Sequence, residues 1–296
     1  MLRRQMRDQA VRVLTATMST LARRLAGLAR ACHPEPTVAV TAVAAGLALA
    51  VGHRGGDAAL VTATIAASQL AVGWANDALD ADRDQAVKRT DKPIATGQVS
   101  RRTVTVAAAV AAVATVLLAT PFGPIPTAVA TVGLISGLAY NWPLKRTVLS
   151  PLPYACSFAA LPAFVVLALP ATPPGWLVLA GALLGSGAHF ANVLPDLAED
   201  AVTGIRGAPH RLGELGAGRV AGGLLLAATA VLVFGRTQPP TPIGLAGLLL
   251  ATVALPAGWY AGHRARRRGR RPTALFRAFL VVALVDVSLL VFGGSF

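Results

Sequence analysis

Four aspartates lie within eight residues of a chain that has few acids. The sequence has 296 residues and only 13 Asp and Glu, yet the segment NDALDADRD at 76–84 holds four of them. At about 100° per residue in a helix, Asp77, Asp80 and Asp84 fall on one face, and Asp82 points nearly the opposite way. Three carboxylates on one face repel each other, so we expect this face to bind cations and Asp82 to face solvent.

A second acidic segment, NVLPDLAED at 192–200, repeats the pattern 116 residues later. Both segments follow N-x3-D-x3-D-x8-P-x3-G, which pairs Asn76 with Asn192, Asp80 with Asp196, Asp84 with Asp200, Pro93 with Pro209, and Gly97 with Gly213. So many matches without a gap indicate two related halves of the chain. We expect the second segment to form an equivalent stripe on one helix face, and the two stripes to face one pocket.

Two facing carboxylate stripes are suited to a metal-bound diphosphate. Carboxylate oxygens select Mg²⁺, Ca²⁺ or Mn²⁺ over zinc, and Mg²⁺ usually combines one or two carboxylates with water and substrate phosphates. Lys145 is a candidate partner for the diphosphate, because its loop is short and Tyr140 lies nearby at the end of an apolar segment. Further candidate cations follow the stripes or adjoin Lys145: Lys88, Arg89, Lys92, Arg146, Arg206 and Arg211.

Long apolar segments must position these residues. The chain is 54% hydrophobic and 14% charged, whereas soluble domains carry about 25% charged residues. A membrane-spanning helix needs about 20 apolar residues. Nine candidates are predicted, at 34–52, 57–76, 102–120, 123–140, 149–169, 174–194, 217–235, 241–260 and 274–293. We therefore predict an all-α integral membrane protein with nine transmembrane helices, arranged as two related four-helix halves and a ninth helix.

The basic residues indicate an orientation in the cell membrane. With a cytoplasmic N-terminus, 25 of the 27 Lys and Arg lie on the cytoplasmic side, and only Arg54 and Arg236 lie outside, as the positive-inside rule requires. The acidic segments are then cytoplasmic and the C-terminus is outside. This charge flanks apolar segments and does not alternate with aromatics, which argues against nucleic-acid binding. The basic run at 263–271 is interpreted as an orientation signal that contacts anionic lipids.

The chain is expected to divide into two parts. Residues 1–33 are basic and are predicted to form an amphipathic helix on the cytoplasmic face of the membrane. Residues 34–296 would form the transmembrane domain, which includes the motif loops at 76–101 and 192–216. Asp286 is a lone acid in the last apolar segment, and we interpret it as a helix-packing hydrogen-bond partner or a protonated acid.

The motifs resemble those of the UbiA superfamily of intramembrane prenyltransferases. NDALDADRD is similar to its N-D-x-x-D-x-x-x-D motif, and DLAED to its second motif, D-x-x-x-D. KPIATGQVS resembles the family's R-P-x-x-x-G-x-x-S stretch, with Lys92 in place of Arg. YNWPLKR resembles its Tyr…Leu-Lys-Arg loop. The matched motifs run from about residue 70 to residue 216.

This resemblance implies a nine-helix membrane fold with a central cavity and Mg²⁺-dependent ionisation of an isoprenyl diphosphate. It implies that Mg²⁺ is held against the diphosphate by five carboxylates: Asp77, Asp80, Asp84, Asp196 and Asp200. Asn76 and Asn192 would assist them. The resemblance also assigns the diphosphate oxygens to Lys88, Arg89, Lys92, Lys145 and Arg146. Tyr140 would face the developing allylic cation or the diphosphate.

Three functions are compared. The favoured one transfers the isoprenyl group through an allylic carbocation to a small aromatic or quinone-precursor acceptor, with His189 as the candidate acceptor contact because it lies on the side of the second stripe. The alternative is a membrane terpene cyclase of the same superfamily, which needs no acceptor. An aromatic content of 5% weighs against the cyclase. A transporter is disfavoured because the acids lie at helix ends beside basic loops.

Overall fold

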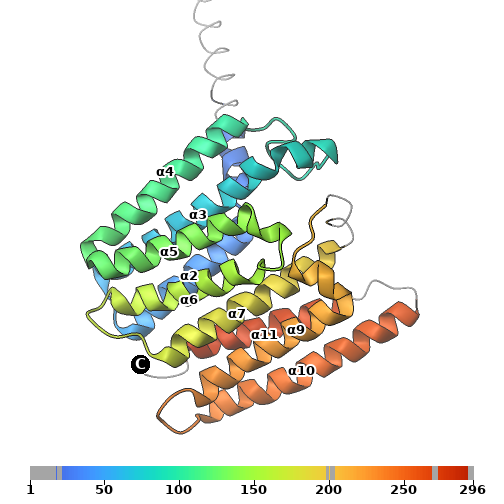
Figure 1. Cartoon of the computed structure of the whole chain (residues 1–296). Coiled ribbons are helices and arrows are strands. Elements are labelled where there is room, and N and C mark those ends of the chain that lie inside the picture. The colour runs from blue at the N-terminus through green and yellow to red at the C-terminus, as the bar shows by residue number, and fades with distance from the viewer. Residues whose placement is uncertain (1–17, 19–21, 198–199, 201–203, 269–272, 293–296) are drawn as a thin grey trace, which may run out of the picture.

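A computed structural model describes residues 18, 22–197, 200, 204–268 and 273–292, and within these ranges the regular structure is entirely helical (Figure 1). The long helices are α2 (Pro34–Val51), α3 (Gly55–Ala86), α4 (Arg101–Ala119), α5 (Pro124–Asn141), α6 (Pro151–Leu167), α7 (Gly175–Val193), α9 (Ala208–Phe234), α10 (Pro242–Arg267) and α11 (Thr273–Phe292). Short 3-10 helices occur at η1 (Thr120–Phe122), η2 (Leu144–Arg146) and η3 (Leu194–Asp196). The predicted all-helical class is confirmed.

Seven helices of the described chain are long and apolar enough to cross a membrane: α2, α3, α4, α7, α9, α10 and α11, where α4 and α7 are extended by η1 and η3. The helices α5 and α6 lie beside them but fall outside this group, so the count of nine spans stays a prediction. The predicted amphipathic helix at 1–33 lies largely outside the described residues. Of this segment, residues 22–31 are helical.

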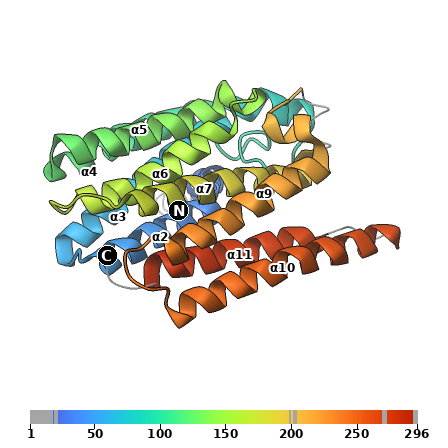
Figure 2. The same ribbon diagram turned by 60° about the horizontal axis from the view of Figure 1, so that its bottom comes forward.

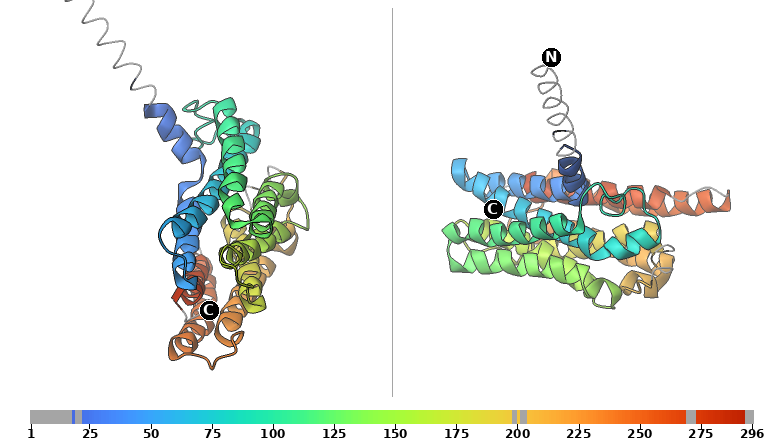
Figure 3. Two further views of the ribbon diagram at one scale, coloured as in Figure 1. Left: turned by 90° about the vertical axis from the view of Figure 1, so that its left-hand side faces the viewer. Right: turned by 90° about the horizontal axis from the view of Figure 1, so that it is seen from above.

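Each long helix packs against its neighbour in sequence, and the last returns to the first. α11 contacts α9, α7 and α2, in addition to α10. The helices α4 and α5 lie at one edge of the bundle, and α10 and α11 lie at the other (Figure 2). Viewed from above, most helices run side by side along their lengths (Figure 3). The loops that follow α3, α5 and α7 therefore meet at one end of the bundle (Figure 1).

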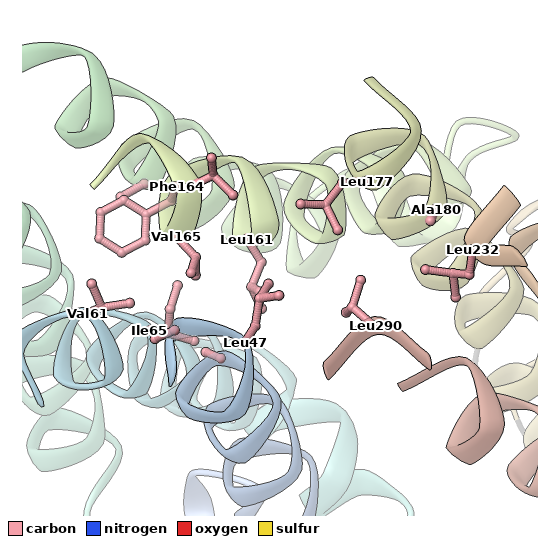
Figure 4. Close-up of a cluster of buried hydrophobic side chains, with 14 of the residues drawn as sticks. Leu47, Val61, Ile65, Leu161, Phe164, Val165, Leu177, Ala180, Leu232 and Leu290 are labelled. Atoms are coloured by element: carbon pink, nitrogen blue, oxygen red, sulfur yellow. The ribbon is translucent and has the colours of Figure 1, made fainter. Parts of the chain in front are cut away.

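Apolar side chains from α2, α3 and α6 form the core at the other end. Phe164 and Val165 of α6 point toward Val61 and Ile65 of α3, and Leu47 of α2 lies in the same cluster (Figure 4). All five are buried. Burial of a side chain of this size contributes about 1.5–3 kcal/mol relative to water, although lipid replaces water on the outer faces of such a bundle.

Close helix contacts depend on small residues. A Cβ placed on Gly185 of α7 would lie 2.5 Å from the Cβ of Phe158 in α6, and one on Gly73 of α3 would lie 2.2 Å from the carbonyl oxygen of Cys32. Gly73 therefore lets the segment before α2 approach α3 closely. Elsewhere, Thr229 Oγ1 donates a 2.6 Å hydrogen bond to Asp286 Oδ1. Asp286 thus has an interhelical hydrogen-bond partner, as one of its two interpretations expected.

Candidate active site

A cavity of about 1120 Å³ lies between α2, α3, α5, α6 and α7 and reaches the loops at one end of the bundle. All but two of the predicted site residues line it: Asn76, Asp77, Asp80, Asp84, Arg89, Lys92, Tyr140, Lys145, His189, Asn192, Asp196 and Asp200. The other two, Lys88 and Arg146, are exposed and lie outside the lining. Arg206 and Arg211 are likewise exposed and outside it. The fold therefore brings the two acidic segments to one space.

The first acidic stripe lies on one unbroken helix. α3 continues to Ala86, so Asp77, Asp80 and Asp84 keep the spacing that places them on one face. Their exposed fractions are 2%, 5% and 2%. Asp82 is instead 80% exposed, and its carboxylate pairs with Arg101 at 3.0 Å. The prediction that Asp82 faces solvent is confirmed.

Two cations neutralise the centre of this stripe. Lys145 Nζ donates to both oxygens of Asp80, at 2.5 and 2.7 Å. Arg83 donates to Asp80 Oδ2 at 3.0 Å and reaches Asp84 Oδ1 at 3.5 Å. Burial lowers the pKa of Lys145 below its ordinary value, although the Asp80 carboxylate favours the charged ammonium. Arg83 is a site residue that the sequence analysis missed, although it lies inside the first motif.

A third cation and a histidine lie beside Asp77, the first aspartate of the stripe. Lys92 Nζ donates to Asp77 Oδ1 at 2.8 Å, and His33 Nε2 lies 3.2 Å from Lys92 Nζ and 3.6 Å from Asp77 Oδ1. His33 has a left-handed backbone, with φ of 55°. Such a conformation is uncommon for residues other than glycine. His33 could not be predicted as a site residue because it belongs to no motif, and only packing onto α3 brings it to Asp77.

Arg89 and Asn76 make contacts that position neighbouring groups. Arg89 donates to both carboxylate oxygens of Asp91, at 2.9 and 2.8 Å. These bonds hold the pKa of Asp91 well below its usual range. Asn76 donates to Asn141 Oδ1 at 3.1 Å, and Asn141 in turn donates to the carbonyl oxygen of Val72 at 2.8 Å. The first motif is thereby joined to the end of α5.

The second acidic segment does not form the expected single helical stripe, so that expectation is wrong. α7 ends at Val193, and the chain continues as the 3-10 helix η3. Pro195 lies at this break, where it lacks an N–H donor and clashes with the preceding turn of an α-helix. Asn192, Asp196 and Asp200 still line the cavity. His210 Nε2 lies 3.3 Å from Asp200 Oδ2.

The two segments are nevertheless followed by glycines with similar backbone conformations. Gly97 has φ of 72° and its predicted counterpart Gly213 has φ of 65°. Both values lie in the left-handed region that glycine adopts without steric cost. Pro93 and Pro209 are both buried. The register read from the sequence therefore pairs positions that also share a local conformation.

Aromatic rings line the cavity below the acids. The ring centroid of Tyr140 lies 4.8 Å from that of Tyr154 and 5.4 Å from that of His189, in edge-to-face contacts. Phe158 stacks on Tyr154 at 6.1 Å. His189 is 1% exposed and its Nε2 lies 3.0 Å from Ser150 Oγ. Tyr154 of α6 and Ser150, which precedes α6, could not be predicted from the sequence because neither belongs to a recognisable motif.

The donor set fits a hard divalent cation. Five carboxylates line one cavity, and Asp77 Oδ2 is buried without a hydrogen-bond partner among the described residues. Within the same described ranges, no three His, Cys, Asp or Glu side chains are close enough together to form a metal cluster by themselves. Lysine and arginine are instead paired with Asp77, Asp80 and Asp84. Oxygen donors of this kind suit Mg²⁺ when phosphate supplies further ligands.

The chain is similar to one known family in sequence and to solved structures in fold. The model of the UbiA prenyltransferase family matches residues 37–283. A UbiA homologue from Archaeoglobus fulgidus has a similar fold when bound to GPP and Mg²⁺, with TM-score 0.68, 15% identity, and 90% of this chain and 100% of that chain covered. Its complex with DMAPP and Mg²⁺ gives TM-score 0.67 and 15% identity, and covers 89% and 97% of the two chains.

A third structure, of a UbiA homologue from Aeropyrum pernix K1 in its apo state, has TM-score 0.61 and 22% identity, with 86% of this chain and 95% of that chain covered. No curated protein sequence matches the chain. At these low identities, the structural matches show a shared fold and leave the chemistry to be argued from the residues. The family match covers most of the chain.

Proposed function

Because the chain belongs to the UbiA prenyltransferase family, we propose that it transfers an isoprenyl group from a prenyl diphosphate to a small aromatic or quinone-precursor acceptor, with Mg²⁺ as cofactor. One observation carries this proposal. The two acidic segments and basic side chains that include Lys145, Arg83 and Lys92 line one end of a single cavity whose continuation is aromatic and apolar. Such a cavity matches a substrate with an ionic head and a hydrocarbon tail.

The ionic end would bind the diphosphate and its metal. We assign Mg²⁺ to the carboxylates already named on α3 and at 196 and 200, with Asn76 and Asn192 in support. Bound Mg²⁺ would stabilise the negative charge on the departing diphosphate as a Lewis acid. Lys145, Arg83 and Lys92 lie close enough to the carboxylates to bind diphosphate oxygens at the same place. Lys88, Arg89 and Arg146 complete the proposed set from the loops.

The reaction breaks the bond between C1 of the prenyl chain and the diphosphate oxygen, and the electron pair leaves with the diphosphate. C1 becomes an allylic cation, which the π faces of Tyr140 and Tyr154 stabilise. A nucleophilic atom of the acceptor forms a bond to C1, and the acceptor loses one proton to a diphosphate oxygen. The buried aromatic and apolar walls keep water from the cation, which water would convert to an alcohol.

The acceptor is assigned to the side of the cavity that holds His189. Ser150 engages His189 Nε2, whereas Nδ1 is buried without a hydrogen-bond partner among the described residues. Asn192 hydrogen-bonds with the side chain of Tyr154. Polar groups that are otherwise held in place can orient a small polar acceptor beside the cation. His189 is thus a positioning residue for the acceptor in this proposal.

We further propose the membrane arrangement that the sequence predicts. Nine helices, α2–α7 and α9–α11, would span the cell membrane, with the acidic segments on the cytoplasmic side and the C-terminus outside. The basic loops would contact anionic lipids. The matched glycine conformations at Gly97 and Gly213 support two related halves, followed by a ninth helix. The segment 1–33 would lie on the cytoplasmic surface before the transmembrane domain at 34–296.

One observation favours a second candidate. Although aromatic residues are few, Tyr140, Tyr154 and Phe158 all line the cavity. Grouped aromatic faces stabilise migrating carbocations, which a terpene cyclase needs. The aromatic content of 5% therefore weighs less against cyclisation once these rings are found at one cavity. In a cyclase, a double bond of the substrate itself would attack C1, and no acceptor would take part.

The experiment uses the purified full chain in lipid nanodiscs with Mg²⁺ and farnesyl diphosphate. Diphosphate release is measured with and without 4-hydroxybenzoate or a hydroquinone as acceptor. Release that requires the acceptor, with a prenylated product, supports the transferase. Cyclic hydrocarbon formed without acceptor supports the cyclase. EDTA should abolish consumption of the prenyl diphosphate. If geranyl, farnesyl and geranylgeranyl diphosphate all show no EDTA-sensitive consumption, the proposed function is wrong.

A further inference from the structure

A layer of apolar side chains from three helices lines the cavity on the side away from the acidic segments. We call this layer the floor, and it consists of Ile65 of α3, Ala130 and Leu134 of α5, and Leu161 and Phe164 of α6. All five residues are buried. Each lines the cavity, and four of them also belong to the main hydrophobic core. The cavity therefore ends where the packed core begins.

Beyond the floor the core continues. Val61 and Val165 lie next to Ile65 and Phe164 (Figure 4), and neither lines the cavity. On the same side, the ring of Phe122 contacts that of Phe164 edge-to-face, with centroids 5.9 Å apart. Protein interiors are packed as densely as organic crystals, so a chain cannot extend past this layer unless a side chain is displaced.

The ionic end fixes where the reacting carbon lies. Asn141, at the end of α5, accepts a hydrogen bond from Asn76, which lies one turn before Asp80 on α3. Tyr140 is the neighbour of Asn141, and Tyr154 packs against Tyr140. When the diphosphate occupies the Asp80 and Lys145 end, C1 therefore lies near the two tyrosines. The hydrocarbon tail must extend from there toward the floor.

Residue separations along α5 and α6 give the length of cavity that is available to the hydrocarbon tail. Tyr140 and Ala130 are ten residues apart on α5, and Tyr154 and Phe164 are ten residues apart on α6. At about 1.5 Å per residue, both helices give about 15 Å from the tyrosines to Ala130 and Phe164, the floor residues that lie farthest from them. An extended isoprene unit has four bonds of about 1.5 Å along its chain and spans about 5 Å. The space therefore holds about three units.

We propose that the floor limits the prenyl chain to fifteen carbons, so that the substrate is geranyl or farnesyl diphosphate and the twenty-carbon chain is rejected. This inference rests on the proposed function, because it concerns the same diphosphate-binding cavity. Phe164 is its main determinant. Its ring is fully buried and is the largest side chain of the floor.

The test measures binding, so it needs no acceptor. Thiolodiphosphate analogues of dimethylallyl, geranyl, farnesyl and geranylgeranyl diphosphate, which resist ionisation, are titrated with Mg²⁺ into the purified full chain. Affinity should rise up to the farnesyl analogue and fall about tenfold for the geranylgeranyl analogue, the scale of discrimination that a closed apolar pocket achieves. A geranylgeranyl analogue that binds as tightly as the farnesyl analogue would overturn the proposal, because its tail must then leave between helices.

Substitutions in the floor test whether these side chains set the length preference. In Phe164→Ala and Ile65→Ala, the affinity for the geranylgeranyl analogue relative to that for the farnesyl analogue should rise about tenfold. Phe122→Ala is the matched control, because Phe122 packs against Phe164 but does not line the cavity, and it should leave the preference unchanged. Phe164→Leu serves if the alanine variant does not fold, with a smaller shift in the same direction. An unchanged preference in the Phe164 and Ile65 variants overturns the assignment.

Failure of the inference can be told apart from failure of the proposed function. If no analogue binds with Mg²⁺, the diphosphate site is wrong and the prenyltransferase proposal fails with it. If all analogues bind, and the affinity increases steadily to twenty carbons in every variant, the site stands and only the length limit is wrong. Comparison of the ratio of two affinities between a variant and the wild type also cancels differences in partition of the analogues into the detergent.

Discussion

The acidic segments at 76–84 and 192–200 share a pattern of residues but differ in structure. α3 carries the first segment without interruption to Ala86, whereas α7 ends at Val193, within the second segment. Asp77, Asp80 and Asp84 of the first segment are buried, whereas Asp196 is exposed at the same cavity. A single proline, Pro195, explains the divergence, because the first segment has Leu79 at the matching position.

The two segments also differ in how their charge is balanced. Asp77 and Lys92 form a buried ion pair in the first segment, and the offset of 116 places Val193 and Ala208 at the matching positions. At these two positions the first segment has both an acid and a base, and the second segment has neither. This pairing follows from energetics, because one buried charge without its partner is strongly destabilising. The first segment is preorganised by protein cations, and the second lacks this pair.

The largest expected effect comes from removing the central acid of either segment. Asp80→Ala and Asp196→Ala should each lower turnover by about a thousandfold or more, because each removes a proposed ligand of the Mg²⁺ that would stabilise the departing diphosphate. Prenyl diphosphate consumption measures this loss, and recovery of each variant from the membrane fraction shows that it still inserts. Near-normal activity in either variant would show that the two segments do not form one site.

The next effect concerns the ion pair that only the first segment has. Lys92→Ala should lower the free energy of unfolding by about 3 kcal/mol, because it leaves the buried Asp77 carboxylate without its lysine. Adding Asp77→Val, which converts both positions to the residues of the second segment, should recover most of the loss. Thermal unfolding in detergent measures both variants. A double variant as unstable as Lys92→Ala would contradict the pairing argument.

A smaller effect is expected at Arg83, whose matching position in the second segment is Glu199, outside the described residues. Arg83→Gln should lower kcat/KM for the prenyl diphosphate about tenfold, because one charge-assisted contact to Asp80 and the diphosphate is lost. Steady-state kinetics at saturating Mg²⁺ measures this change. Arg101→Gln is the matched control, because Arg101 lies outside the cavity lining and pairs with the exposed Asp82. Equal losses in both variants would argue against a site role for Arg83.

The smallest effect is expected at Asp82, the one aspartate of the first segment that faces solvent. Asp82→Ala removes an exposed ion pair with Arg101, and such pairs contribute about 0–1 kcal/mol. Activity should stay within about twofold of the wild type, and the free energy of unfolding should stay within about 0.5 kcal/mol of it. A large loss of activity in this variant would mean that the face assignment along α3 is mistaken.

Much of the site could be predicted from the sequence because helix spacing is local. The positions of Asp77, Asp80 and Asp84 on one face need only an unbroken helix, and the matched register identified the second acidic segment. His33, Tyr154 and Ser150 could not be predicted in this way. They come from elements without a motif, and contacts between distant segments bring them to the cavity. Pro195 was a visible sign of a helix break, but the repeat favoured an unbroken stripe.

By itself, the sequence determined the helical class, the family and the acidic composition of the site. These properties depend on hydrophobic segment length and on residue spacing, which are encoded along the chain. Only the tertiary structure decided which cations pair with which aspartates, where the aromatic wall lies and where the cavity ends. Those features arise from the way α2, α3, α5, α6 and α7 pack side by side, because packing selects which of many distant side chains come into contact.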